Sequence, residues 1–324
     1  MTFNISRRNL IGSTAAGIAA AGVAGSPAAF AQDDKPTVSV GSKDITEQLI
    51  IGEMVAQLLE NEGFPVERNL NLGGTFIVHE ALLNGDIDTY LEYTGTALIA
   101  VLDEELPERE EAGTAEASAT PASGDSYAQK VFDIVEERYA EDFDLEWLEP
   151  WGFNNTTALA MSRERAEELG IVKISDLEEH AGDLNIGAAA EVVVREDGVP
   201  GVQETYGFEF GDVTTLDAGL MYSAVAEGEV DVIMAYATDG RIDTLDLVLL
   251  EDDLGFFPPY FAAPVFRKDT LEESPEIRDI VNQLAGKVPD ARMTEMNALA
   301  DDEGVPHADI VRNFLIEEGI VEEE

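Results

Sequence analysis

The sequence contains no cysteine and only three histidines among 324 residues. The lack of cysteine excludes disulfide bridges, thiolate metal sites and cysteine nucleophiles. The histidines, His79, His180 and His307, stand far apart, and none has the spacing to another that a metal-binding pair requires. We therefore expect them to lie exposed or on helix surfaces, and we expect no bound metal.

Positive charge is also scarce. The chain carries 19 Lys and Arg against 67 Asp and Glu, which gives a formal net charge of −48. Nucleic acids and anionic lipid headgroups attract basic surfaces, so both are excluded as partners. The acids are spread over the whole sequence, which indicates a solvated acidic surface of the kind that high external salt would screen. Apolar residues still make up 45%, enough for the cores of two ordinary domains.

Long apolar runs are absent as well, and no stretch reaches the roughly 18 strongly apolar residues that would predict a transmembrane helix. The N-terminus instead resembles a twin-arginine export signal. Arg7 and Arg8 stand in tandem in "SRRNLIG", a weakly apolar small-residue stretch follows, and "AFA" (29–31) is typical of a cleavage site. We predict a twin-arginine signal peptide over residues 1–31 and a mature protein in the periplasm or on the extracellular face.

The spacing of apolar residues predicts alternating strands and helices. Strands are expected at 37–42, 66–72 and 87–93, with helices at 44–63 and 73–85 between them. A β-α-β-α-β order predicts a parallel sheet. A second set of such units begins after residue 151.

Two further features divide the chain. Residues 103–125 are rich in Ala, Ser, Thr, Pro and Glu, and we predict that they form a disordered insertion. The second set of units interrupts the first, so we expect an α/β fold of two lobes. Lobe 1 is predicted to comprise residues 37–151 and 253–324, and lobe 2 residues 152–252. The chain would then cross between the lobes twice.

A small unit occurs twice, in "ALLNGDIDTYLEYTG" (81–95) and in "AVAEGEVDVIMAYATDG" (224–240). In both, a glycine stands eight residues and an aspartate five residues before a tyrosine, Tyr93 or Tyr236. Each tyrosine would lie at the carboxyl end of a strand, where open parallel sheets bind ligands. The two tyrosines come from different lobes, so we expect them to face each other across a cleft.

A third tyrosine, Tyr260, follows "FFPP" at the second crossing. Tyrosine faces that converge on one point bind a cation such as quaternary ammonium, at about 0.5–2 kcal/mol for each desolvated face. On these residues alone the alternative stays open that all three are core tyrosines whose hydroxyls bond to the backbone.

The sequence resembles the glycine betaine/choline/carnitine substrate-binding proteins of osmoprotectant ABC importers. The resemblance rests on segments in one order, including "NLGGTFIVHEALLNGDIDTYLEYTGTAL", "PWGFNNTTALAM", "VVVREDGVPGVQETYGFEF" and "TDGRI" with "LEDDLGFFPPY". It covers nearly all of the mature chain. It implies a two-lobe periplasmic-binding-protein fold of type II, with two crossovers and a ligand cleft between the lobes, and no cofactor.

The resemblance also implies site residues. The aromatic cage of the family corresponds to Tyr93, Tyr236, Tyr260 and a fourth position, usually tyrosine, that is Thr157 here. Trp151 and Phe153 are the nearest candidates in sequence to supply the missing ring. The ligand carboxylate would be bound by Lys43, Thr96 and Arg195, and Asn155 is a further candidate contact. Lys43 precedes a predicted helix N-terminus, which favours an anion, and Arg195 can offer a carboxylate two parallel N–H donors.

We therefore expect a monomeric binding protein that captures a quaternary-ammonium compatible solute, such as glycine betaine, and delivers it to an ABC permease. No nucleophile–base pair is recognisable in the sequence, so we expect no enzyme and name no catalytic residue. Two alternatives stay open: a binding protein for another small polar or cationic solute, and a choline-ester hydrolase on the same fold.

Overall fold

The structure, a computed structural model, describes residues 35–108 and 126–322. The predicted signal peptide (1–31) and residues 109–125 of the predicted insertion lie outside the described residues. Residues 103–108, which begin that insertion, contain no helix or strand. In the part of the chain that is described, no helix is both long enough and apolar enough to cross a membrane.

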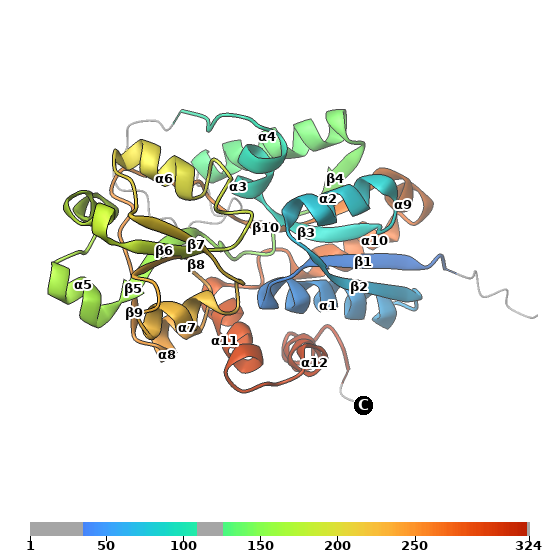
Figure 1. Cartoon of the computed structure of the whole chain (residues 1–324). Coiled ribbons are helices and arrows are strands. Elements are labelled where there is room, and N and C mark those ends of the chain that lie inside the picture. The colour runs from blue at the N-terminus through green and yellow to red at the C-terminus, as the bar shows by residue number, and fades with distance from the viewer. Residues whose placement is uncertain (1–34, 109–125, 323–324) are drawn as a thin grey trace, which may run out of the picture. The chain divides into compact units, whose positions relative to one another are not determined.

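The first sheet has five strands in the order β2-β1-β3-β10-β4 (Figure 1). Its first three strands are parallel, as the β-α-β-α-β pattern predicts, whereas β10 runs antiparallel to both β3 and β4. The sheet is therefore mixed, because β10 is the strand by which the chain returns after building the second sheet. The strands are β1 (Val38–Lys43), β2 (Val66–Gly73), β3 (Thr89–Tyr93), β4 (Leu145–Trp147) and β10 (Ala262–Arg267).

Helices from both ends of the described chain belong to this lobe. Helix α1 packs against β1 and β2, and also against α10, α11 and α12 near the C-terminus. These helices are α1 (Thr46–Asn61), α2 (Thr75–Asn84), α3 (Thr94–Thr96), α4 (Ser126–Asp142), α9 (Lys268–Glu273), α10 (Glu276–Val281), α11 (Asp290–Asp301) and α12 (His307–Glu317), with a π-helical turn at Ala97–Val101 and a 3-10 turn at Asn282–Leu284.

The second sheet has the order β7-β6-β8-β5-β9, with β6 parallel to β7 and β8, and β5 antiparallel to β8 and β9. Its strands are β5 (Thr157–Ser162), β6 (Asn185–Ala188), β7 (Asp212–Thr215), β8 (Val232–Tyr236) and β9 (Leu247–Leu249). The helices between them are α5 (Arg163–Leu169), α6 (Val199–Tyr206), α7 (Met221–Ala226) and α8 (Arg241–Thr244), with 3-10 turns at Ile174–Glu179 and Ala181–Asp183. The sequence pattern did not predict β4 or β7, which are short strands at the edges of their sheets.

The two crossings between the sheets lie side by side. Asn155 N donates to Tyr260 O over 3.1 Å, and Tyr260 N donates to Asn154 Oδ1 over 2.7 Å. Two sheets joined by two paired crossings are the predicted α/β two-lobe fold of type II. The residue limits of the two lobes stay a prediction.

The repeated unit, at 85–93 and 228–236, fixes the register between neighbouring strands through its aspartate. Asp88 Oδ2 accepts a hydrogen bond from Ser39 N of β1 over 2.7 Å, and Asp231 Oδ2 accepts one from Asn185 N of β6 over 3.0 Å. The preceding glycine has a positive φ in both copies, 75° at Gly85 and 74° at Gly228, a conformation that ends a helix without a Cβ clash. Each unit therefore delivers its tyrosine to the same end of an equivalent strand.

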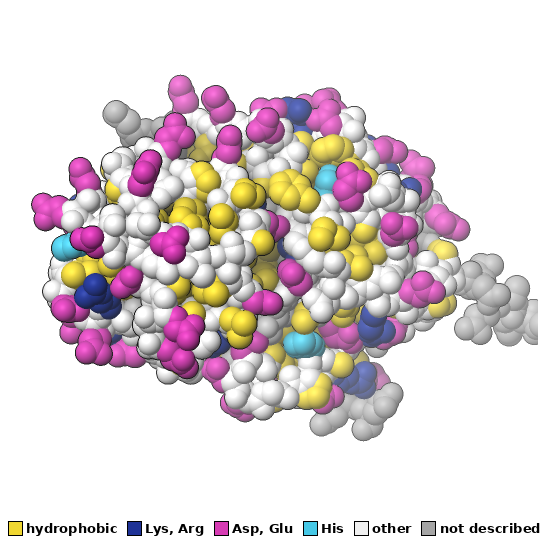
Figure 2. All heavy atoms as spheres, viewed as in Figure 1, with side chains coloured by type: hydrophobic (Ala, Val, Ile, Leu, Met, Phe, Trp, Pro, Cys, Tyr) yellow, Lys and Arg dark blue, Asp and Glu magenta, His cyan; other side chains and the backbone are white. Residues whose placement is uncertain are grey.

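Acidic side chains outnumber basic ones on the face of the molecule drawn in Figure 2. Figure 2 shows Asp and Glu spread over the viewed face, with far fewer Lys and Arg among them. This distribution agrees with a solvated acidic surface rather than with one concentrated acidic patch.

His79 corrects one prediction. We expected exposed or helix-surface histidines, but His79, on α2, is only 6% exposed and packs edge-on against Tyr139 and Phe143, with ring centroids 5.5 and 4.9 Å away. Neither ring nitrogen has a hydrogen-bond partner among the described residues. Burial, together with the charge of Lys43, lowers the pKa of His79 to about 4. The prediction was wrong because α2 turns this residue toward α4.

His79 should make the protein less stable in acid. Between its unfolded pKa of about 6.5 and its folded pKa of about 4, the unfolded chain binds a proton that the folded chain rejects, so stability falls as pH falls. Replacing His79 by Leu should remove on the order of 2–3 kcal/mol of the loss in unfolding free energy between pH 7 and pH 4. Urea denaturation at a series of pH values measures this. His180→Leu, at a partly exposed position, is the control, and equal pH slopes for the parent and His79→Leu would contradict the prediction.

Candidate functional site

A cavity of about 520 Å³ lies where β3 and β8 end, and residues of both lobes and both crossings line it. This volume is typical of a small-molecule site. All eight residues predicted to contact a ligand belong to its lining: Tyr93, Tyr236, Tyr260, Thr157, Lys43, Thr96, Arg195 and Asn155. The structure thus brings together residues that are up to 217 positions apart in the sequence.

Carboxylates fix the hydroxyl groups of two of the tyrosines. Tyr93 Oη donates to Glu47 Oε1 over 2.6 Å, and Tyr260 Oη donates to Asp197 Oδ2 over 3.0 Å. Side-chain acids rather than the backbone therefore satisfy these hydroxyls, in contrast to the core-tyrosine alternative. Burial raises the pKa of Tyr93, Tyr236 and Tyr260, so all three stay neutral.

Gly95 allows the second crossing to reach the end of β3. A Cβ at this position would lie 2.9 Å from both Tyr260 Cε1 and Pro259 O, closer than side-chain atoms pack. The absence of a side chain at residue 95 thus lets the Tyr260 ring lie next to the end of the strand that carries Tyr93.

Thr157 lines the cavity at the position where the family usually has tyrosine. It begins β5, directly opposite Tyr236 in the antiparallel ladder, and is 7% exposed. Neither Trp151 nor Phe153 supplies the missing ring, since both are fully buried in the core and neither belongs to the lining. Phe76, in the first turn of α2, is the remaining aromatic residue of the lining and is 49% exposed.

Lys43 is buried and already paired. Its Nζ lies 2.5 Å from Glu92 Oε1 and donates to Thr75 Oγ1 over 2.9 Å. The same ammonium lies 5.2 Å from the centroid of the Tyr93 ring, within the range of a cation–π contact. Glu92 is fully buried and also accepts a hydrogen bond from Tyr90 Oη.

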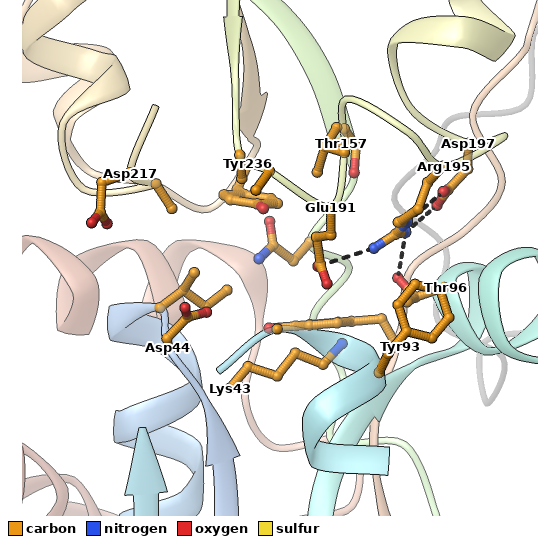
Figure 3. A pocket seen from close by; sticks show the side chains of 18 of the residues that line it. Lys43, Asp44, Tyr93, Thr96, Thr157, Glu191, Arg195, Asp197, Asp217 and Tyr236 are labelled. Atoms are coloured by element: carbon orange, nitrogen blue, oxygen red, sulfur yellow. Dashed lines mark hydrogen bonds and ion pairs between the residues drawn. The ribbon is translucent and has the colours of Figure 1, made fainter. Parts of the chain in front are cut away.

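Arg195 is paired too, with an acid two residues away. Its Nε donates to Asp197 Oδ1 over 2.7 Å and its Nη2 to Asp197 Oδ2, so this fork of the guanidinium already grips a carboxylate. Nη1 donates to Glu191 Oε1 over 3.2 Å, and Nη2 also reaches Thr96 Oγ1 at 3.3 Å. Figure 3 shows these contacts, of which the one with Thr96 joins the two sides of the cleft.

Four acids that bond to predicted site residues were not themselves predicted: Glu47, Glu92, Glu191 and Asp197. The i, i+4 spacing of Glu191 and Arg195, and the proximity of Asp197 in "REDG", are signals that could have identified two of them. Glu47 gave no such signal, because its partners are Tyr93, Asn155, Thr238 and Asn297. Burial raises the pKa of Glu47.

The cleft continues into a smaller cavity of about 130 Å³, and the residues that line both cavities are Asp44, Ile45, Asn155, Asp217, Ala218 and Tyr236. Acids dominate its lining as well, with Arg241 as the cationic residue: Asp44, Glu47, Asp217, Asp239 and Asp301. The buried Oδ1 atoms of Asn155 and Asn297 have no partner among the described residues. Across residues 35–108 and 126–322, no group of three His, Asp or Glu is arranged to hold a metal ion.

Comparison with known proteins identifies the family. A model of the substrate-binding domain of ABC-type glycine betaine transport systems matches residues 36–317. The "Glycine-betaine-binding protein" of Pseudomonas aeruginosa is 34% identical over 300 residues, which cover 89% of each chain. A crystal structure titled as a glycine betaine/carnitine/choline ABC transporter has a TM-score of 0.67 and 31% identity, and the match covers 87% of this chain and 99% of that one.

A further relative is longer than this chain. The "Ergothioneine transport permease/ergothioneine binding protein EgtU" of Helicobacter pylori is 36% identical over 267 residues, which cover 82% of this chain and 44% of that protein. The chain thus matches less than half of the length of this relative.

These matches confirm the resemblance found in the sequence and speak against the hydrolase alternative. The chain belongs to the family of substrate-binding domains of ABC-type glycine betaine transport systems, and it is a non-enzymatic, extracytoplasmic component of an ABC importer that binds quaternary-ammonium compatible solutes.

Proposed function

We propose that the cleft binds the quaternary ammonium head of a betaine-type solute between Tyr93, Tyr236 and Tyr260. One observation carries this proposal: these tyrosines, two of them at the ends of equivalent strands in different lobes, line one cavity. A ring from each lobe would contact the same ligand, so ligand binding would favour the closed arrangement of the lobes.

The charge of the cavity supports a cationic head group. Two cationic residues and four acids belong to the lining, Lys43 and Arg195 against Asp44, Glu191, Asp197 and Asp217. A cleft with an excess of one sign of charge concentrates ions of the opposite sign. The excess of carboxylates therefore favours a ligand that brings positive charge.

We propose that the other end of the solute, its carboxylate, binds near Lys43, Thr96 and Arg195. All three line the same cavity as the tyrosines. Arg195 Nη2 lies 3.3 Å from Thr96 Oγ1, so these two groups from different lobes can reach one ligand oxygen. Asn155, in the first crossing, is a further contact in this proposal.

Ergothioneine is a second candidate ligand. Two observations favour it: the 36% identity with the Helicobacter pylori protein, and the small Thr157 side chain where a tyrosine would otherwise occupy space. Ergothioneine is itself a betaine, so its trimethylammonium group would use the same tyrosines and its ring would need the added room.

The protein also needs an export pathway and a permease that accepts the solute. We propose export through the twin-arginine pathway, on the basis of Arg7 and Arg8, and delivery of the solute by a monomer to an ABC permease. Family membership supports the extracytoplasmic location and the importer.

Tyr236 is the sharpest position for a test of the aromatic cage, because carboxylates bind the hydroxyls of Tyr93 and Tyr260. Tyr236→Ala should weaken binding of glycine betaine or choline by about 0.5–2 kcal/mol, since it removes one ring face. Tyr236→Phe keeps the face and should retain most of the affinity. Isothermal calorimetry measures both, and equal affinities for the parent and Tyr236→Ala would show that the ring does not contact the ligand.

Replacing Thr157 by Tyr should restore the fourth wall of the cage. Residue 157 is buried and lines the cavity, so we expect a ring there to extend toward the ligand. Glycine betaine should bind up to about tenfold more tightly, equivalent to roughly 1.4 kcal/mol, whereas ergothioneine should bind less tightly because it needs the space. Thr157→Val, which adds no ring, is the matched control. If Thr157→Tyr leaves both affinities unchanged, residue 157 does not face the ligand.

Export has its own test. Changing both Arg7 and Arg8 to Lys keeps the charge but removes the paired arginines that the pathway reads. The double variant should accumulate in the cytoplasm of the host, measured by fractionation and immunoblotting against the parent. Unchanged export of the double variant would rule out the twin-arginine route.

A further inference from the structure

We propose that Glu191 occupies the place of the ligand carboxylate in this cleft and thereby determines whether a cationic or a zwitterionic solute is preferred. The inference rests on the proposed function, since it assigns the anion end of the same site. It makes Glu191 a specificity-determining residue and adds it to the predicted set of Lys43, Thr96 and Arg195.

The carboxylate of Glu191 bonds to Arg195, one of the groups proposed for the ligand carboxylate, and to Thr75, which bonds to a second one, Lys43. Glu191 comes from lobe 2, yet its Oε2 accepts a hydrogen bond from Thr75 N of lobe 1 over 2.7 Å. Its Oε1 accepts from Thr75 Oγ1 and from Arg195 Nη1, both over 3.2 Å. Thr75 is the first residue of the ten-residue helix α2, so its N–H is one of the free donors at a helix N-terminus, where negative charge is favoured.

Thr75 connects this carboxylate to the other predicted anion ligand. Lys43 Nζ donates to Thr75 Oγ1 over 2.9 Å, and the same hydroxyl donates onward to Glu191. Glu191 therefore lies between the two cations of the site, as Figure 3 shows, with Lys43 on one side of the cleft and Arg195 on the other.

Carboxylates already outnumber the cations of the site. Glu92 pairs with Lys43, Asp197 grips Arg195, and Glu191 bonds to Arg195 as well. Three carboxylates thus surround two cations, and the group carries one net negative charge. A solute with a net positive charge neutralises the net negative charge of these five side chains. A zwitterion instead brings a fourth carboxylate to Lys43 and Arg195, which already donate hydrogen bonds to carboxylates of the protein.

Glu191 can be displaced, unlike the other two acids. Its side chain is 23% exposed, compared with 1% for Asp197 and none for Glu92. A betaine carboxylate would therefore have to push Glu191 toward solvent and take over its bonds to Thr75 and Arg195. A cation without a carboxylate, such as choline, can bind with Glu191 in place, and Glu191 then continues to bond lobe 2 to lobe 1.

The test separates the anion site from the cage with two small probes, acetate and tetramethylammonium. The mature protein and its Glu191→Ala variant are titrated with each by nuclear magnetic resonance, with chloride exchanged for acetate at constant ionic strength. Acetate should bind Glu191→Ala about tenfold more tightly than the parent, because Thr75 N–H and Arg195 Nη1 are then free. The Kd ratio of glycine betaine to choline, measured by calorimetry, should fall by a similar factor.

Two control variants separate site occupancy from charge. Glu191→Gln removes the charge but still fills the space and can accept the Thr75 N–H bond, so it should bind acetate no more than about threefold better than the parent. Glu196→Ala removes an exposed acid on the same segment and should behave as the parent does.

The outcomes distinguish this inference from the proposed cage. Two results would overturn the inference, because either would mean that Glu191 does not occupy the anion site. In the first, acetate binds Glu191→Ala no better than it binds the parent. In the second, acetate binds Glu191→Gln as tightly as it binds Glu191→Ala. If tetramethylammonium binds neither protein while acetate binds Glu191→Ala, the cage is wrong and the role of Glu191 is supported.

Discussion

The arrangement of the cleft depends on one buried carboxylate, that of Glu47 in the first turn of α1. It is 4% exposed and accepts hydrogen bonds from Tyr93, Asn155, Thr238 and Asn297. These donors belong to the first sheet, a crossing, the second lobe and helix α11. Four donors offset part of the desolvation of the carboxylate, and its loss would leave the buried donors of Tyr93, Asn155 and Thr238 without this partner. Glu47 thus fixes the end of β3, one crossing and the edge of the second lobe relative to α1.

The same principle recurs throughout the site, where polar groups expected to contact a ligand are positioned by acids. Asp197 binds both Arg195 and Tyr260, and Glu92 binds Lys43. The high acid content of the chain is therefore not confined to its solvated surface. Within the cleft it provides the hydrogen-bond acceptors that orient tyrosine rings and cations before any solute arrives, which lowers the ordering cost of binding.

The repeated unit links the folding of each lobe to the site. Asp88 and Asp231 each accept a hydrogen bond from the neighbouring strand, so register and the position of the strand-end tyrosine are set together. A one-residue slip of either strand would turn Tyr93 or Tyr236 to the opposite face of its sheet. The site therefore depends on correct register in both sheets.

The sequence by itself determined the alternation of strands and helices, the repeated unit and the tyrosines of the proposed cage, because periodicity, glycine turns and motif spacing are local properties. With the family resemblance it also predicted eight of the residues that line the cavity. It could not determine that Thr75 and Glu191, 116 residues apart, bond to each other, or that Glu47 joins four elements. Nor could it show that α2 buries His79 or that β10 runs antiparallel to β3. Only the tertiary structure decided these, because pairing across two lobes depends on how distant elements pack, which no local pattern encodes.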